Sequence, residues 1–112
     1  MRPLPEVLRE RRDGAALELE LSVPGDLACF DGHFPGRPVL PGVAQIDWSA
    51  RYARERLGVR GEFSAAENLK FFSMVAPGAR LTLKLRLEDS RLRFEFTDEA
   101  RKVSSGTLVF SG

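Results

Sequence analysis

Alternation between apolar and polar side chains predicts most of the secondary structure of this chain. In residues 15–23, leucines and a valine alternate with glutamates and a serine, which is typical of a strand with one buried face. Leucines and phenylalanines alternate with charged residues on both sides of the turn at Asp89-Ser90, which predicts a hairpin. The segments predicted as strands are residues 15–23, 66–74, 81–88, 91–96 and 103–110.

A single helix is predicted between the first of these strands and the others. Pro41 is favourable in a first helical turn and Gly58 provides the stop, so the helix is expected over residues 43–57. Residues 3–12 predict a short helix or an ordered tail. One helix and antiparallel strands with a polar outer face together predict an α+β domain in which a sheet wraps the helix. The apolar residues of the helix recur in steps of three and four and predict one buried stripe of Val43, Ile46, Ala50, Ala53 and Leu57.

Length, charge and cysteine content narrow the class of protein. The 112 residues suit one domain, residues 1–112, and a formal net charge of +1 is too weak to indicate nucleic-acid binding. The single cysteine, Cys29, excludes an intramolecular disulfide and, with only one histidine in the chain, a zinc site of the usual spacing. No apolar run reaches the ~18 residues of a membrane-spanning helix or forms a signal peptide, so we expect a cytoplasmic protein.

Two side chains stand out as candidates for chemistry. His33 lies in a glycine- and proline-rich loop, residues 30–42, directly before the predicted helix. An imidazole suits general acid–base catalysis near neutral pH, but a loop histidine also serves turn packing, and both interpretations stay open. Asp47 lies on the predicted buried stripe, where burial raises the pKa of a carboxyl group and keeps it ready to donate a proton. Its alternative position is the stripe edge, within reach of Arg51 or solvent.

The start of the helix offers a third chemical group. The first N–H groups of a helix have no intrahelical acceptor, so the amides of Gly42 and Val43 can stabilise a developing oxyanion, although every helix start has such groups. Trp48 and Tyr52 are interpreted as packing residues. An imidazole, a carboxylate fourteen residues later and a helix N-terminus between them form a candidate acid–base site.

The run CFDGHFPGRPVLPGVAQIDW, residues 29–48, resembles the active-site segment of the hotdog-fold 3-hydroxyacyl-[acyl-carrier-protein] dehydratases of the FabZ and FabA types. The family pattern is G-H-F-P-x-x-P-V-x-P-G-V followed by a helical Glu or Asp, and this chain keeps the fourteen-residue step from His33 to Asp47. A later stretch, ENLKFFSMVAPGARLTL, is similar to the family's strand and Pro-Gly turn. The matching positions of the first motif are Gly32, His33, Phe34, Pro35, Pro38, Val39, Pro41, Gly42 and Val43.

The resemblance implies a hotdog fold, with one long central helix wrapped by an antiparallel sheet, and a homodimer whose active sites are shared between subunits. The implied reaction is reversible elimination of water from a 3-hydroxyacyl thioester on acyl carrier protein or CoA. His33 would remove the C2 proton, and Asp47 would protonate or orient the departing C3 hydroxyl. Amides at Gly42 and Val43 would polarise the thioester carbonyl. No metal or redox cofactor is implied, because the substrate arrives on the phosphopantetheine arm of its carrier. The candidates to line a tunnel for this arm are Phe34, Pro35, Phe71 and Phe72.

Differences from the family pattern bear on the pathway and leave two alternative functions. FabZ proteins usually place Glu where Asp47 stands, and the version PGVAQIDW looks more like the dehydratases of specialised pathways such as aryl polyene synthesis. A hotdog acyl thioesterase is one alternative, and the histidine loop argues against it. A non-catalytic acyl- or carrier-binding subunit is the other, and the presence of both His33 and Asp47 argues against it.

Overall fold

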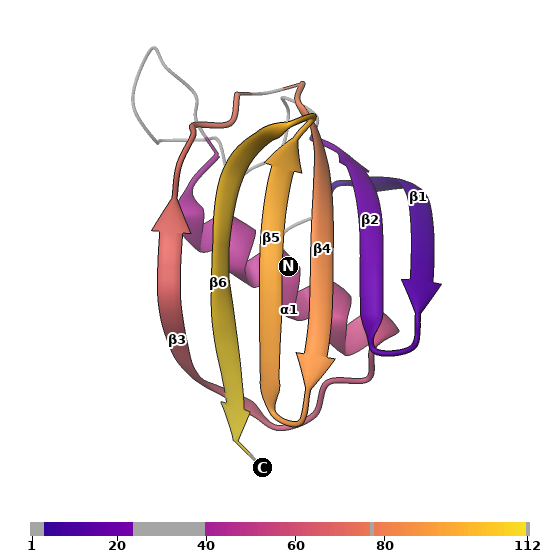
Figure 1. Ribbon diagram of the computed structural model, residues 1–112, viewed down its shortest axis with the longest axis vertical. Coiled ribbons are helices and arrows are strands. Elements are labelled where there is room, and N and C mark those ends of the chain that lie inside the picture. The colour runs from indigo at the N-terminus through magenta and orange to yellow at the C-terminus, as the bar shows by residue number, and fades with distance from the viewer. Residues whose placement is uncertain (1–3, 24–39, 77, 112) are drawn as a thin grey trace.

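In the computed structural model, one helix lies against one face of a curved sheet (Figure 1). The structure describes residues 4–23, 40–76 and 78–111. The described helix is neither long enough nor apolar enough to cross a membrane. In chain order, the elements are β1 (Glu6–Asp13), β2 (Ala16–Ser22), α1 (Gly42–Arg56), β3 (Glu62–Phe71), β4 (Arg80–Glu88), β5 (Arg91–Asp98) and β6 (Arg101–Ser111).

The strands form one sheet in the order β1-β2-β4-β5-β6-β3, with every neighbouring pair antiparallel. Strand β3 follows the helix in the chain but pairs with the last strand, so β1 and β3 are the two edges of the sheet. Helix α1 begins beside β3 and ends beside β1, so it runs across the width of the sheet before the chain returns to form β3 (Figure 1). This arrangement confirms the predicted α+β architecture of a sheet wrapped around one helix.

The core lies between the inner face of the sheet and α1. Alternate leucines of β2 and β4 and phenylalanines of β5 are buried against the helix, as their alternation predicts. Each such side chain contributes about 1.5–3 kcal/mol when it is fully buried. Trp48 and Tyr52 are buried in the same core, which confirms their interpretation as packing residues.

The prediction for residues 3–12 was wrong, because most of this segment is the edge strand β1. Its side chains are largely charged and exposed on both faces, so it has no alternation that would reveal a strand. The strand forms because its backbone pairs with β2, from Glu6 opposite Ser22 to Asp13 opposite Ala16. Pairing with a neighbour therefore overrides the weak local signal of this segment.

The prediction of the buried helix stripe was also wrong in part. Val43, its first member, is 71% exposed, and Ile46, Ala50 and Leu57 are only partly buried. The buried face is rotated because two polar residues, which an apolar pattern leaves out, lie in the core with hydrogen-bond partners. The residues that α1 buries are Ala44, Gln45, Trp48, Ser49, Tyr52 and Ala53.

Candidate active site

The N-terminus of α1 begins at Gly42, directly after Pro41 in extended backbone. Two amides of the first turn, those of Ala44 and Gln45, donate to the Pro41 carbonyl at 3.1 and 3.3 Å. Within the part of the chain that the structure describes, no side chain caps this end of the helix. The N–H groups of Gly42 and Val43 have no acceptor among the described residues. The helix dipole and these amides together favour negative charge just beyond the helix start.

An aromatic ring approaches Gly42 so closely that a larger residue there would have to displace it. A Cβ atom built there would lie 2.7 Å from Cε1 and Cζ of Phe71, closer than real carbon contacts allow. The Phe71 ring, at the end of β3, therefore packs directly against the helix start. Phe72 differs, since its amide donates to the Val103 carbonyl and its ring lies under the Lys102 ammonium group, 5.8 Å away. Of these two predicted tunnel residues, the structure places Phe71 beside Gly42.

Backbone hydrogen bonds hold the chain on either side of this contact. The Leu40 amide donates to the Val75 carbonyl at 2.8 Å, which ties the residue before α1 to the segment after β3. In that same segment, the Ser73 hydroxyl donates to the Lys102 carbonyl at 2.8 Å. The helix start and the end of β3 are thus fixed relative to each other and to β6.

Asp47 lies on α1 one turn after Val43, on the same side of the helix. Its side chain is 43% exposed, and its Oδ2 atom lies 3.6 Å from Nη1 of Arg51. The prediction of a buried carboxylate was therefore wrong, and the alternative at the stripe edge, within reach of Arg51, is confirmed. A half-exposed carboxylate on the side of the helix that carries Val43 is open to a molecule arriving at the helix start.

Three predicted site residues, His33, Phe34 and Pro35, lie outside the described residues. Their roles stay predictions, as does the approach of His33 to Asp47. Within the described part of the chain, no three His, Cys, Asp or Glu side chains gather where they are able to hold a metal ion.

Sequence reasoning missed a buried polar pair beside the helix start. The Ser104 hydroxyl donates to Oε1 of Gln45 at 2.6 Å, and both side chains are buried between α1 and β6. A signal was available, because Ser104 is a polar residue at an inward position of a strand that also turns Leu108 and Phe110 inward. A polar residue at such a position indicates a partner within the core.

Large apolar side chains are exposed around this end of the helix and along the edge strand β3. Among the described strands, β3 pairs only with β6, and it carries two irregularities, one of them at Asn68, which has a φ of 53°. Such exposed apolar groups on a strand with a free edge are typical of an interaction surface. Its exposed apolar residues and those beside the helix start are Val43, Phe63, Leu69, Phe71, Phe72 and Met74.

A hollow formed by described residues lies elsewhere on the molecule. It is a trough of about 840 Å³ across the outer face of the sheet, away from α1, and charged side chains such as Lys84, Arg86 and Arg93 line it. Neither Gly42 nor Asp47 lines this trough. The candidate residues Gly42 and Asp47 therefore lie on the helix side of the sheet, apart from this trough.

Comparison with known protein families gives a match over most of the chain. Residues 9–107 match the ApeI-like family, described as ApeI dehydratase. A 3-hydroxyacyl-[acyl-carrier-protein] dehydratase FabZ of Novosphingobium aromaticivorans is 42% identical over 73 residues, which are 57% of this chain and 46% of the relative. Another FabZ, of Herpetosiphon aurantiacus, is 33% identical over 90 residues, 74% of this chain and 63% of the relative. The chain spans about half the length of the first curated relatives it matches.

Solved structures show the same fold. A chain of the dehydratase heterocomplex ApeI:P from Xenorhabdus doucetiae superposes with a TM-score of 0.92 at 31% identity, covering 98% of this chain and 100% of that one. A protein from Erwinia carotovora subsp. atroseptica gives 0.82 at 36% identity, with 97% of each chain covered. The dehydratase domain of PpsC from Mycobacterium tuberculosis, at 17% identity and a TM-score of 0.73, shares the fold alone. These matches confirm the expected hotdog fold.

Proposed function

The chain belongs to the ApeI-like dehydratase family, and on that premise we propose that it eliminates water reversibly from a 3-hydroxyacyl thioester to give a trans-2-enoyl thioester. One observation carries the proposal for this chain. The Gly42 and Val43 amides, which have no acceptor among the described residues, lie about one turn before the half-exposed carboxylate of Asp47 at the same end of α1. An elimination next to a thioester needs both groups, because negative charge develops on the carbonyl oxygen while a hydroxyl leaves two carbons away.

Each group has a role in the proposed reaction. His33 takes the C2 proton, and the electrons of that C–H bond form the C2–C3 double bond as the C3–O bond breaks. Asp47 protonates or orients the departing hydroxyl, which leaves as water. The amides of Gly42 and Val43 donate to the thioester carbonyl oxygen, whose charge grows as the C2 proton leaves.

We propose that two copies of the chain join edge to edge through β3 and share their active sites, with His33 and Asp47 of one site coming from different copies. Support comes from the free edge of β3 and from the exposed apolar side chains beside it, which include Phe71 and Met74. The related chain from Xenorhabdus doucetiae belongs to a heterocomplex, so a related second chain is the alternative partner at the same edge.

The substrate in this proposal is held on the phosphopantetheine arm of acyl carrier protein or on CoA, and the protein acts in the cytoplasm. The reaction moves only protons and a hydroxyl group and needs no metal or redox cofactor. The acyl chain and the arm would pass the aromatic residues beside the helix start, and the contact of Phe71 with Gly42 supports a place for them there. The proposed lining is completed by Phe34, Pro35 and Phe72.

The test follows the conjugated enoyl group by its ultraviolet absorbance. Wild type, His33→Ala and Asp47→Asn are given 3-hydroxybutyryl and crotonyl thioesters, both as N-acetylcysteamine derivatives and on carrier protein. We expect turnover by wild type and a loss of roughly 100-fold or more in each variant. Arg60→Ala, an exposed residue beyond the end of α1, serves as the control and keeps full activity.

Other outcomes separate the alternative functions. Release of free thiol without a change in the enoyl absorbance would replace the dehydratase by a thioesterase. Binding of the acyl carrier with neither reaction, by a folded protein, would favour the non-catalytic subunit.

A further inference from the structure

The N-terminal half of α1 is joined to the sheet by the hydrogen bond between Gln45 and Ser104. The hydroxyl of Ser104 on β6 donates to Oε1 of Gln45 at 2.6 Å, and the two residues are 1% and 2% exposed, respectively. Among the described residues, no other hydrogen bond joins two buried side chains. Apolar packing between a helix and a sheet tolerates small sliding movements, whereas a hydrogen bond fixes both distance and direction.

The position of this bond connects it to the candidate site. Gln45 lies in the first turn of α1, between Gly42 and Asp47. On the sheet, Ser104 is the register partner of Phe71, the residue whose ring packs on Gly42. The start of α1 is therefore joined to the sheet in two ways. Gln45 bonds to Ser104, and Gly42 contacts Phe71, which is paired with Ser104.

Loss of the hydrogen bond between Ser104 and Gln45 has a predictable physical result. Removal of the Ser104 hydroxyl leaves the Gln45 amide group buried without one of its partners, and a buried unpaired polar group is costly. The first turn of α1 then relieves that cost by moving relative to β6. Such a movement displaces the Gly42 amide and the Asp47 carboxylate together, because Gln45 lies between them at the same end of α1.

We propose that Gln45 and Ser104 are positioning residues, which set the first turn of α1 against the sheet so that the Gly42 amide and Asp47 act on the same thioester. This inference rests on the proposed dehydratase function. Neither side chain touches the substrate; each acts through the placement of the helix.

Ser49 provides a matched control for the kinetic test. It is buried like Ser104, but its hydroxyl donates to the Gln45 carbonyl at 2.9 Å within the helix and does not join α1 to the sheet. On the N-acetylcysteamine substrate we expect Ser104→Ala and Gln45→Met to lower kcat by roughly ten- to a hundredfold, with KM changed less than about threefold. Ser49→Ala keeps the wild-type kcat. Equal kcat values for Ser104→Ala and Ser49→Ala would overturn the proposal.

The double variant Gln45→Met/Ser104→Ala separates positioning from a general loss of stability. Since it removes both polar partners, it leaves no unpaired buried group, and its kcat should be no lower than that of either single variant. Additive losses would show that the two residues act separately and would contradict the inference.

A readout independent of activity keeps this inference distinct from the proposed function. In ¹⁵N-labelled protein, we expect the amide resonance of Gly42 to move in Ser104→Ala and to stay in place in Ser49→Ala. If wild type eliminates no water while the resonance still moves in this way, the proposed function fails and the placement of the helix by Ser104 stands. An unmoved Gly42 resonance in Ser104→Ala contradicts the placement, whatever the activity.

Discussion

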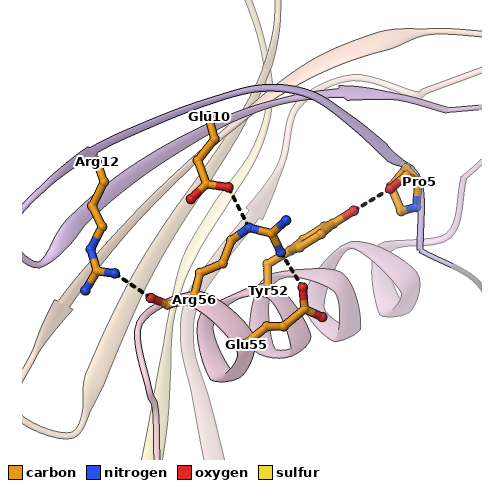
Figure 2. A network of polar contacts seen from close by, with 6 residues as sticks. All are labelled: Pro5, Glu10, Arg12, Tyr52, Glu55 and Arg56. Atoms are coloured by element: carbon orange, nitrogen blue, oxygen red, sulfur yellow. Dashed lines mark hydrogen bonds and ion pairs between the residues drawn. The ribbon is translucent and has the colours of Figure 1, made fainter.

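The two edges of the sheet differ in their contacts with α1 and in the side chains that they expose. At the β1 edge, polar contacts join the strand and the residue before it to the C-terminal half of α1 (Figure 2). The Tyr52 hydroxyl donates to the Pro5 carbonyl at 2.7 Å, and the Arg56 guanidinium binds the Glu10 carboxylate at 2.8 Å. Arg12 in turn donates to the Arg56 carbonyl at 2.9 Å. This edge is held by partners within the chain itself.

At the β3 edge, the described residues provide no such cover. Phe71 is 50% exposed, Val43 and Met74 more so, and all three lie near the N-terminus of α1, on the other side of the molecule from β1. Polar contacts close one edge, and apolar surface is left open at the other, beside the candidate site. This difference is the reason that the proposed dimer is placed at the β3 edge and not at the β1 edge.

The largest expected effect comes from a charge placed at the open edge. Phe71→Lys should abolish association through β3, because a buried ammonium group without a partner opposes it, and should reduce activity by at least roughly 100-fold if the active sites are shared. Sedimentation velocity would follow the change from dimer to monomer. Leu8→Lys is the matched control, since Leu8 is an exposed apolar residue of similar exposure on β1, and it should remain a dimer. Dimers of Phe71→Lys would exclude this edge as the interface.

A smaller effect is expected from Gly42→Ala. Alanine is a better helix former than glycine, so any loss arises from the methyl group that meets the Phe71 ring. We expect a decrease of roughly tenfold in kcat and of about 1–2 kcal/mol in the free energy of unfolding. Kinetics and urea unfolding measure the two effects. The double variant Gly42→Ala/Phe71→Leu removes the steric conflict and should recover most of the stability; no recovery would show that the ring is not responsible.

At the β1 edge, Tyr52→Phe should lower the free energy of unfolding by about 1–2 kcal/mol, because it leaves the Pro5 carbonyl without its donor. Burial raises the pKa of the Tyr52 phenol well above its ordinary value of 10.0. The folded protein therefore holds this proton more tightly than the unfolded chain. The stabilisation is complete below pH 10 and declines as the pH rises above it.

Tyr52 is the only tyrosine in the chain, so the absorbance of phenolate reports this one group. We expect that absorbance to appear together with unfolding as the pH is raised. Ionisation of the phenol at its ordinary pKa in the folded protein would contradict the burial of Tyr52 between α1 and the β1 edge.

The smallest effect is expected from Glu10→Gln. The carboxylate of Glu10 is 40% exposed, so water screens its ion pair with Arg56 and the loss should be about 0.5 kcal/mol or less. Thermal unfolding at low and high salt would measure it, with the difference between variant and wild type shrinking as salt is added. A loss as large as that of Tyr52→Phe would show that the ion pair, and not the phenol, closes this edge.

The sequence predicted those parts of the fold that depend on local alternation. Strands β2, β4 and β5 were predicted because each buries one of its two faces. Strand β1 was missed because its side chains are largely charged and exposed on both faces, so it shows no alternation and forms through backbone pairing with β2. The buried face of α1 was misplaced because Gln45 and Ser49 are polar, and their partners become visible only in three dimensions.

The candidate site was predicted in the same uneven way. Pro41 and Gly42 identify the helix start, and Asp47 follows from the motif. The contact of Phe71 with Gly42 depends on β3 taking the far edge beside β6, which no local pattern encodes. The role of His33 stays a prediction.

The burial of Trp48, the single tryptophan of the chain, has a practical consequence. Its indole is fully enclosed between α1 and the sheet, so its fluorescence reports one event, the departure of the helix from the core. Emission from a buried indole shifts to longer wavelength when water reaches it. The protein thus carries an intrinsic optical reporter on the helix of its candidate site, and stopped-flow fluorescence can time the docking of that helix without any added label.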